Sequence, residues 1–186
     1  MPRALSGILF ALLTLVPTGS DADRILSRPP ANAARLGFEY TIAFWTVPFG
    51  RTSFETRLDR SSYVTSSHFE TSGIISAFWQ STIDASSNGT ISAREISPAL
   101  YDSYYRRGSK HQRVRLTYAA GAIPVTYADP PYNLNRYPVT DAEKKEGLDP
   151  LGAATAVLAG MHSSASNPCG TVAAVFDGRR RYFRGP

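Results

Sequence analysis

Apolar and polar side chains alternate along one short segment after another in this 186-residue chain. The alternation is clear in residues 36–44, 51–60, 63–71 and 112–118, and a shorter segment, 123–127, carries a proline. A period of two places one apolar row on one face of a β-strand. Turn-forming residues separate these segments, so the sequence predicts an antiparallel meander with the proline-bearing segment at an edge.

Three turns are marked by residues that tolerate unusual backbone angles. The Asn-Gly pair at 88–89 predicts a type I′ hairpin turn that joins segment 74–83, a strand or a short helix, to segment 90–96. Residues 106–109 predict a second turn, because they include glycine and serine. The Asp-Gly pair at 177–178 lies between two apolar runs and predicts the clearest hairpin of the chain.

Helix signals are confined to residues 140–161. Thr140 followed by Glu143 forms a capping-box pattern for a short helix. Asp149 is a good N-cap, and Pro150 suits the first helical position, where no amide donor is needed. The residues that follow predict one amphipathic helix over 149–161. Its apolar residues at helical spacing are Leu151, Ala154, Val157 and Leu158.

The order of elements predicts a mainly β fold. Many antiparallel strands, one helix and a final hairpin favour a curved sheet, a half-barrel or open barrel, packed against one main α-helix. Such a sheet would bury Leu151, Val157 and Leu158 of the helix. A closed small barrel with the helix packed outside is the alternative. The aromatic content of 11% excludes a disordered chain, and the length suits a single β-rich domain over residues 36–186.

The first 22 residues have the order of a secretory signal peptide. Arg3 precedes an apolar run over 5–16, and the small residues Ser20 and Ala22 offer two cleavage positions. As a helix that run spans about 18 Å, short of the roughly 30 Å hydrocarbon core, and a membrane anchor is the alternative. Residues 23–35 would be a flexible lead-in. We therefore expect a periplasmic protein with no transmembrane segment after cleavage.

Two stretches are distinctive as a pair: residues 146–158 (EGLDPLGAATAVL) and residues 175–182 (VFDGRRRY). Together with residues 38–40 and 48–50, they resemble a family of secreted bacterial proteins known as domain of unknown function 3108, over residues 36–182. The resemblance implies a periplasmic setting in an alphaproteobacterium-like cell and a β-rich, partly open barrel. The family has no established catalytic residue, so the resemblance implies none here.

The single cysteine, Cys169, has no partner, although cysteines of exported proteins normally pair. It would be buried and inert, pair with another chain, or have lost its mate. By the resemblance, family members continue past the final hairpin with further strands and a second cysteine. The chain is therefore expected to be shortened, as a natural version, a truncated reading frame or a fragment.

Catalytic and metal-binding patterns are not evident. The histidines are His68, His111 and His162, and none lies at metal-ligand spacing from another or from the cysteine. No phosphate-binding glycine loop or G-x-S-x-G elbow is present. Asp149 and Asp177 are interpreted as a helix cap and a turn residue. We expect no enzyme, no cofactor and no metal, with a hydrolase that uses His68 or His111 and a nearby serine as an alternative.

Basic residues gather beside two of the turns, and the net charge is +5. Arginines interleaved with aromatic residues can bind anionic groups. Nucleic acid is not expected for an exported protein, so anionic lipid headgroups or acidic envelope polymers are the predicted ligands. A solvated strand face is the alternative. The candidate residues are Arg106, Arg107, Lys110, Arg113, Arg115, Arg179, Arg180 and Arg181.

A half-barrel with one helix can also leave an apolar cleft for an acyl chain. The candidate lining residues are Phe44, Trp45, Phe54, Phe78, Trp79 and Tyr118, and the alternative is that they form the core. We therefore predict a non-enzymatic envelope module that binds a lipid or another anionic envelope component. A structural or protein-interaction factor for envelope integrity, which would use an exposed strand edge or the arginine-rich tail, is the other possibility.

Overall fold

The computed structural model describes residues 33–92, 95–133, 138–161 and 173–183. Seven antiparallel strands form one sheet in chain order. They are β1 (Ala33–Phe44), β2 (Val47–Asp59), β3 (Ser62–Thr71), β4 (Thr82–Ile91), β5 (Ile96–Arg107), β6 (Lys110–Thr117) and β7 (Val125–Asp129). The expected signal peptide and Cys169 lie outside the described residues, and β1 begins inside the segment expected as a lead-in.

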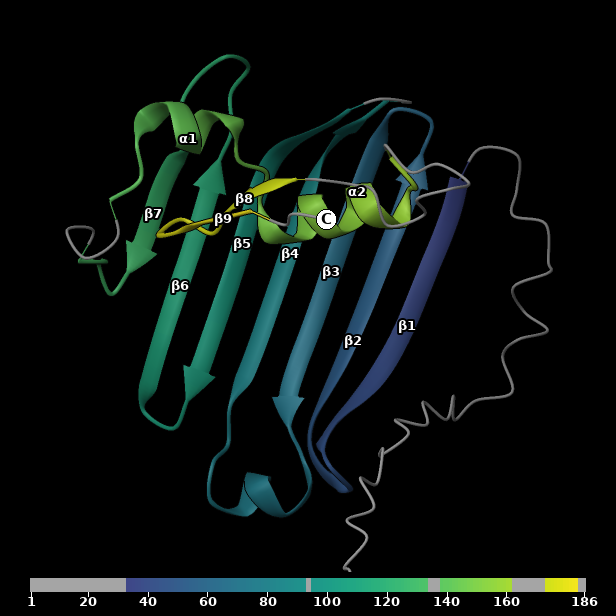
Figure 1. Cartoon of the computed structure of the whole chain (residues 1–186), viewed down its shortest axis with the longest axis vertical. Helices are drawn as coiled ribbons and strands as arrows, with labels where there is room; N and C mark the ends of the chain where they lie inside the picture. Colours follow the sequence, from purple (N-terminus) through teal and green to yellow (C-terminus); the bar gives the residue numbers. More distant parts are fainter. Residues whose placement is uncertain (1–32, 93–94, 134–137, 162–172, 184–186) are drawn as a thin grey trace, which may run out of the picture.

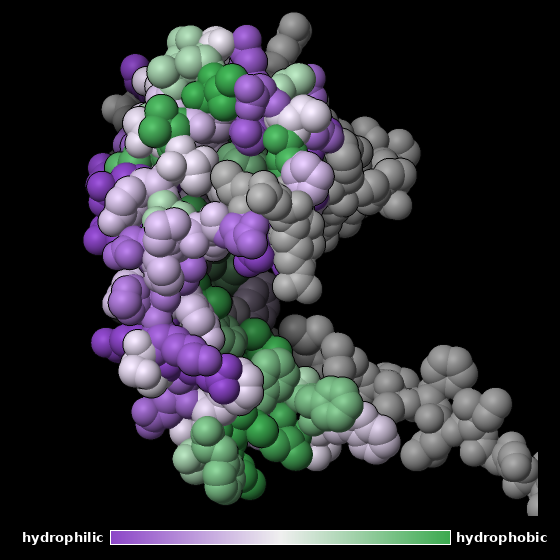
Figure 2. Space-filling model, turned by 90° about the vertical axis from the view of Figure 1, so that its left-hand side faces the viewer, coloured by the Kyte–Doolittle hydropathy of each residue, from purple (hydrophilic) through white to green (hydrophobic). Residues whose placement is uncertain are grey.

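The sheet is curved and open. Among the described strands, β1 pairs with β2 alone and β7 with β6 alone. The predicted mainly β half-barrel with one main helix is therefore confirmed, and the closed-barrel alternative is wrong. Figure 1 shows the main helix, α2 (Pro150–Leu158), crossing one face of the sheet near its upper end. Figure 2 shows the sheet from the side as a crescent whose convex face is largely hydrophilic.

Strand alternation assigns each side chain to one of the two faces. In β3, the buried Tyr63 and Thr65 lie on the concave face, under α2, because Thr65 hydrogen-bonds to a residue of that helix. Val64, between them, points to the convex face and is 56% exposed. The cross-strand register carries this assignment from strand to strand across the whole sheet.

Both predicted helix starts are confirmed. Thr140 and Glu143 form a reciprocal capping box at the start of α1 (Asp141–Glu146). The Asp149 carboxylate accepts hydrogen bonds from the backbone N–H groups of Leu151, at 3.0 Å, and Gly152, at 2.8 Å. One expectation for α2 is wrong: its last two residues are exposed, and the buried residues include the small Ala153 and Ala156. Small side chains let the helix lie close to the sheet.

The Asn-Gly pair at 88–89 does not form the hairpin turn that the sequence predicted. It lies inside β4, at a register irregularity opposite β5, and the chain reverses after Ile91 instead. A Cβ at Gly89 would clash with the carbonyl oxygen of Ser97. Glycine is needed here for close approach of two backbones at a bulge, and not for a turn.

The other turn predictions are confirmed. Gly108, with φ of 54°, lies in the turn between β5 and β6. Strands β8 (Ala174–Phe176) and β9 (Arg181–Phe183) form the final hairpin. Asp177 holds its turn by accepting the backbone N–H groups of Arg179 and Arg180 at 2.8 and 2.7 Å. Gly178, with φ of 90°, packs against Val114 of the sheet so closely that a Cβ would clash.

The core lies between α2, β8 and the upper half of the sheet. One buried cluster joins Tyr63 and Ile96 of the sheet to Ala156 of α2 and to Met161. A second joins Tyr101 and Leu116 to Leu151 and Phe176. Apolar burial of this kind is the main stabilising contribution to folding. Both clusters leave the lower half of the concave face, away from α2, without a covering helix (Figure 1).

Candidate functional site

The upper half of the concave face is polar at the point where α2 crosses it. Thr155 donates a hydrogen bond to the backbone carbonyl of Leu151, at 2.8 Å. Since a hydroxyl has one proton, Thr65 must donate to Thr155, and Thr56 must donate to Thr65, at 2.7 Å in each case. All three threonines are fully buried. The chain of hydroxyls therefore runs in one direction from β2 to the helix.

A second buried chain starts at the helix cap. The other carboxylate oxygen of Asp149 accepts a hydrogen bond from Ser87 at 2.9 Å, and Ser87 in turn accepts one from Tyr63 at 3.0 Å. Burial raises the pKa of Asp149 from 3.8 to about 6, even though hydrogen bonds from Gly152 and Ser87 act to lower it. Every oxygen of this carboxylate has a structural partner, which confirms its interpretation as a cap.

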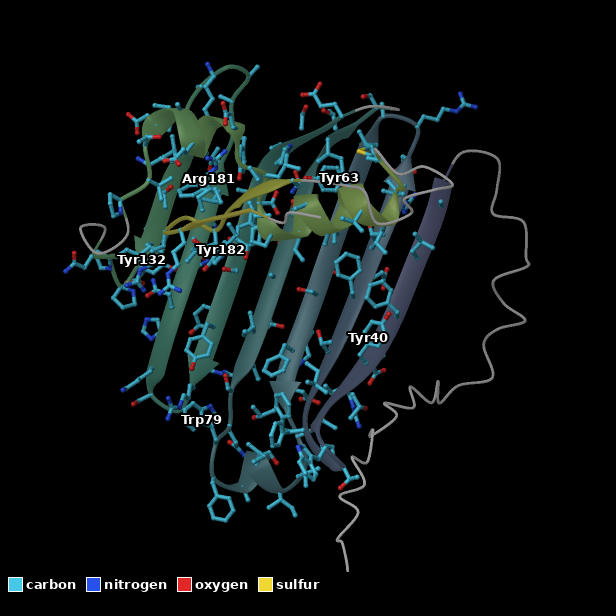
Figure 3. The ribbon with its side chains drawn as sticks, viewed as in Figure 1. Tyr40, Tyr63, Trp79, Tyr132, Arg181 and Tyr182 are labelled. Atoms are coloured by element: carbon cyan, nitrogen blue, oxygen red, sulfur yellow. The ribbon has the colours of Figure 1, made fainter. Side chains whose placement is uncertain are left out.

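The lower half of the concave face is apolar, and no helix in the described part of the chain covers it. The rings of Phe38 and Phe54 stack there with centroids 4.9 Å apart. Tyr40, Leu36 and Ile83 lie on the same face with 38–46% of their surface exposed. In Figure 3, Tyr40 lies on the sheet well below the helix, and Figure 2 shows hydrophobic residues lining the lower part of the hollow. A contiguous exposed apolar surface is typical of a binding site.

The lower end of the sheet is formed by the three turns that follow β1, β3 and β5, because a meander places alternate turns at the same end (Figure 1). Large apolar side chains project from the first two turns. They are Phe44 (73% exposed), Trp45 (86%), Ile74 (72%), Phe78 (88%) and Trp79 (47%). We call these five residues the apolar tip.

Local hydrogen bonds hold the apolar tip in place. The second turn contains a 3-10 helix, η2 (Gly73–Ala77), which confirms the short-helix option for part of this segment. The backbone N–H of Ser72 donates to the carbonyl of Phe49, and Gly73 lies so close to Pro48 that a Cβ would clash. These contacts hold the two turns together, and they fix the positions from which the exposed side chains project.

Trp45 has a backbone that local folding does not favour. Its φ of 58° lies in the left-handed region, where glycine and asparagine are preferred and a bulky residue is rare. The side chain gains no burial in exchange. The two-residue turn between β1 and β2 requires this backbone conformation, and it leaves the aromatic side chain exposed at the end of the sheet.

Cations lie on one side of the apolar tip, on the turn that follows β5. The guanidinium of Arg107 lies 3.2 Å from the centre of the Trp79 ring, a cation–π contact. Arg106 and Lys110 flank the same turn and are exposed. The three turn segments, 44–50, 71–81 and 106–112, contain no aspartate or glutamate. This end of the molecule is therefore both apolar and positively charged.

The convex face carries a shallow polar trough of about 810 Å³. Two rows of convex-face side chains, each running across the strands, line this trough. The backbone of the residues between the two rows forms its floor. Small serines occupy its middle, and ion pairs its margins: Arg51 pairs with Glu39 at 3.2 Å, and Arg113 with Asp102 at 2.8 Å. The lining side chains of this face are Glu39, Ser53, Glu55, Ser66, His68, Asp84, Ser86, Asp102, Tyr104 and Arg113.

His68 lies in this trough. Its Nδ1 atom is 2.6 Å from Asp84 on the neighbouring strand, and Ser53 is opposite it on the other side. Asp–His–Ser is the residue set of a hydrolase triad. Here, however, the three lie in a row on an open sheet face, and among the described residues the hydroxyl bonded to His68, that of Thr52, donates to its backbone carbonyl and not to its ring. Sequence reasoning missed the His68–Asp84 pair, because it depends on the register of two strands.

The eight candidate basic residues are divided among three places. Arg106, Arg107 and Lys110 lie at the lower end, beside the apolar tip. Arg113 and Arg115, on the convex face, both bind Asp102. Partial burial raises the pKa of Asp102, but these two arginine hydrogen bonds outweigh it and hold the pKa below its usual range.

The third group belongs to the final hairpin and is engaged with the protein itself. Arg181 binds Glu143 at 3.2 Å and Glu146 at 3.1 Å. Arg179 lies over the ring of Tyr132, with 5.3 Å between the guanidinium carbon and the ring centre. Figure 3 shows Arg181, Tyr182 and Tyr132 on the left of the upper half, far from the apolar tip.

The six residues proposed to line one apolar cleft are likewise separated. Phe54 lies on the concave face, where the sequence placed it. Tyr118 is largely buried beside the second core cluster, at the opposite end of the sheet. The other four, Phe44, Trp45, Phe78 and Trp79, project at the lower end. Alternation indicates the face of a residue within a strand, but it says nothing of residues in turns.

Neither a metal-binding cluster nor a membrane-spanning helix is present among the described residues. No group of three or more histidine, cysteine, aspartate or glutamate side chains within them is arranged to hold a metal ion. No helix among them has the length and apolar character needed to cross a membrane.

The family model described as "Protein of unknown function (DUF3108)" matches residues 39–184. The chain belongs to this family. The match includes the second half of β1 and every strand from β2 to β9, so it confirms the predicted resemblance. No curated protein and no solved structure gives a match. The geometry of this DUF3108 protein therefore has to carry any functional argument.

Proposed function

We propose that this DUF3108 protein is an exported, non-enzymatic module of the bacterial envelope that binds the acyl chain of a lipid on the uncovered lower half of its concave face. The observation that carries the proposal is the pairing of stacked, half-buried rings with exposed apolar side chains on one face of an open sheet. The stacked Phe38 and Phe54 form its floor, and Tyr40 and Ile83 border it.

Burial of apolar surface would stabilise a bound acyl chain. An acyl chain laid across this surface removes apolar area from water on both partners, at about 25 cal/mol per Å². The convex face also exposes apolar side chains, such as Val64 and Val125, but its other residues include charged side chains that pair with each other. The concave surface is also continuous with the lower end of the molecule, where cations could receive an anionic headgroup.

The N-terminal sequence supports the envelope as the setting, because residues 1–22 have the order of a signal peptide. A fusion of the full chain to a reporter that is active only after export tests this point. Activity is expected with the natural N-terminus and lost when the apolar run is deleted. Equal activity of both fusions would contradict the export part of the proposal.

Lipid binding is tested on the exported protein by mass spectrometry of extracted lipid and by displacement of a fluorescent fatty acid. Ile83→Glu places a charge on the concave apolar surface and is expected to weaken probe binding about tenfold or more. Val64→Glu is the matched control, since Val64 is an exposed apolar residue on the opposite face. Equal probe binding by both variants, or no bound lipid in the natural protein, would overturn the proposal.

The open edges of the sheet favour a second candidate, a protein-interaction factor. Strands β1 and β7 each leave one side without a partner among the described strands, and such edges can pair with another chain. Crosslinking in cells through a photoreactive residue at position 127 of β7 tests it. Recovery of a defined partner supports this candidate, and its absence together with positive lipid binding supports the first.

A further inference from the structure

We propose that the lower end of the sheet docks on an anionic phospholipid bilayer, with the apolar tip inserted at the headgroup level and the nearby cations on the lipid phosphates. The inference deepens the proposed function, and it rests on that function only for the idea that docking brings the acyl-chain site to the bilayer. The docking itself stands on the tip's own geometry.

The first step is exposure. Trp45 and Phe78 keep 86% and 88% of their surface in water, and Ile74 keeps 72%. Such side chains on separate turns project outward, and a protein partner would need a matching pocket for each of them. A bilayer interface accepts projecting aromatic side chains without such pockets, and tryptophan in particular is favoured there.

The second step is charge. Arg106, Arg107 and Lys110 lie on the turn next to the apolar tip, and the three turns contain no acidic residue. At the other end of the sheet, carboxylates in two of the three turns, Asp59 and Glu95, offset Arg60 and Arg94, which neighbour them in sequence. An anionic bilayer attracts basic residues near its surface. The distribution therefore selects an orientation with the lower end toward the membrane.

The third step is pre-organisation. Thr71 donates a hydrogen bond to the carbonyl of Trp79 at 2.8 Å, and Ser76 donates to that of Gly73 at 2.7 Å. Together with the contact between Gly73 and Pro48, these bonds fix the turns before any partner arrives. A fixed tip binds without a large ordering cost. Docked this way, the lower end of the apolar concave face opens toward the lipid.

The chain supplies its own probe for the test. Its two tryptophans, Trp45 and Trp79, both belong to the apolar tip. Titration of the purified protein with vesicles of equal parts phosphatidylglycerol and phosphatidylethanolamine is expected to shift tryptophan emission to shorter wavelength. Brominated acyl chains are expected to quench it. No shift and no quenching at low salt would overturn the proposal.

Two variants separate the contributions. Trp45→Asn with Phe78→Ser removes two exposed rings, and asparagine tolerates the left-handed backbone; we expect vesicle affinity to fall about tenfold or more. Arg106→Gln with Lys110→Gln is expected to remove most of the preference for anionic over phosphatidylcholine vesicles. The matched controls are Val64→Ser with Val125→Ser, and Arg57→Gln with Lys145→Gln, all exposed residues away from the tip.

The outcomes also distinguish this inference from the proposed function. Tip variants are expected to keep their binding of the fluorescent fatty acid in the absence of vesicles. If the tip variants bind vesicles like their controls while Ile83→Glu abolishes fatty-acid binding, the docking inference fails and the lipid site stands. If the protein binds vesicles but no acyl chain, the lipid site fails and the docking inference stands. If the tip variants instead abolish self-association of the natural protein, the tip is an interface between two copies and docking is overturned.

Discussion

The two halves of the concave face have the same strands and opposite chemistry. Under α2, the sheet presents hydroxyl groups that bond to the helix and apolar residues that are almost fully buried. Below α2, the same strands present phenylalanine, tyrosine and isoleucine to solvent. No helix among the described residues covers this apolar surface. The comparison indicates that the upper half maintains the fold and that the lower half is available for binding.

The largest expected effect on stability comes from creating a cavity in the core under α2. Phe176 is 2% exposed and packs with Leu116 and Leu151. Phe176→Ala is expected to lower the free energy of unfolding by about 4 kcal/mol. Urea denaturation followed by circular dichroism measures it. A loss below about 1 kcal/mol would show that this half is not the core.

The next effect is a pH dependence. Because the pKa of Asp149 is raised from 3.8 to about 6 on folding, this group stabilises the fold below about pH 4. That contribution is lost as the pH rises through about 6. The lost contribution amounts to about 3 kcal/mol.

Asp149→Asn keeps an oxygen for the two backbone N–H groups and does not titrate. The difference in unfolding free energy between the natural protein and this variant is therefore expected to move by about 3 kcal/mol, in favour of the variant, between about pH 4 and about pH 7. Parallel urea denaturation at the two pH values measures it. Identical pH profiles would show that the carboxyl is not desolvated.

A smaller effect tests the directional hydroxyl chain. Thr65→Val preserves shape and removes the central hydroxyl, which leaves Thr56 without its acceptor. We expect a loss of about 1–2 kcal/mol in the free energy of unfolding. Thr65→Ser keeps the hydroxyl and is expected to cost less than the valine variant. The comparison of covered and uncovered halves is weakened if valine proves as stable as threonine.

The smallest effect is expected in the uncovered half. Tyr40→Ser changes a residue that is 46% exposed, and surface changes of this kind are usually within about 0.5 kcal/mol. The same variant is expected to weaken fatty-acid binding. A large loss of stability with unchanged binding would assign this half to the core and end the proposed division.

Local signals predicted local structure well. The caps at Thr140 and Asp149 and the turns at 106–109 and 177–178 depend on residues close together in sequence, and all were predicted. The Asn-Gly pair at 88–89 led to a wrong turn prediction. Glycine is required there because the backbone of β5 approaches closely, and a type I′ turn would require glycine as well. The competing demand came from the partner strand of the same hairpin, whose register the local pattern does not reveal.

The candidate site was only partly accessible to sequence reasoning. Alternation placed Phe54 on the apolar face, but the gathering of Trp45, Phe78 and Arg107 at one end required the order of the strands. The pairing of His68 with Asp84 required their register. The sequence also predicted burial of Val157 and Leu158, although the helix approaches the sheet through smaller residues. Contacts of this kind depend on tertiary packing, which single-sequence patterns do not contain.

The one-way chain of hydroxyls from Thr56 through Thr65 to Thr155 also determines how α2 is oriented on the sheet. An apolar floor would accept α2 at several rotations about its axis with similar buried area. The bond from Thr65 of the sheet to Thr155 of α2 instead favours a single rotation and a single height of the helix, because each hydroxyl in the chain has one proton to donate. The buried hydroxyls therefore set where α2 crosses the concave face, and so how much of that face below the helix stays exposed.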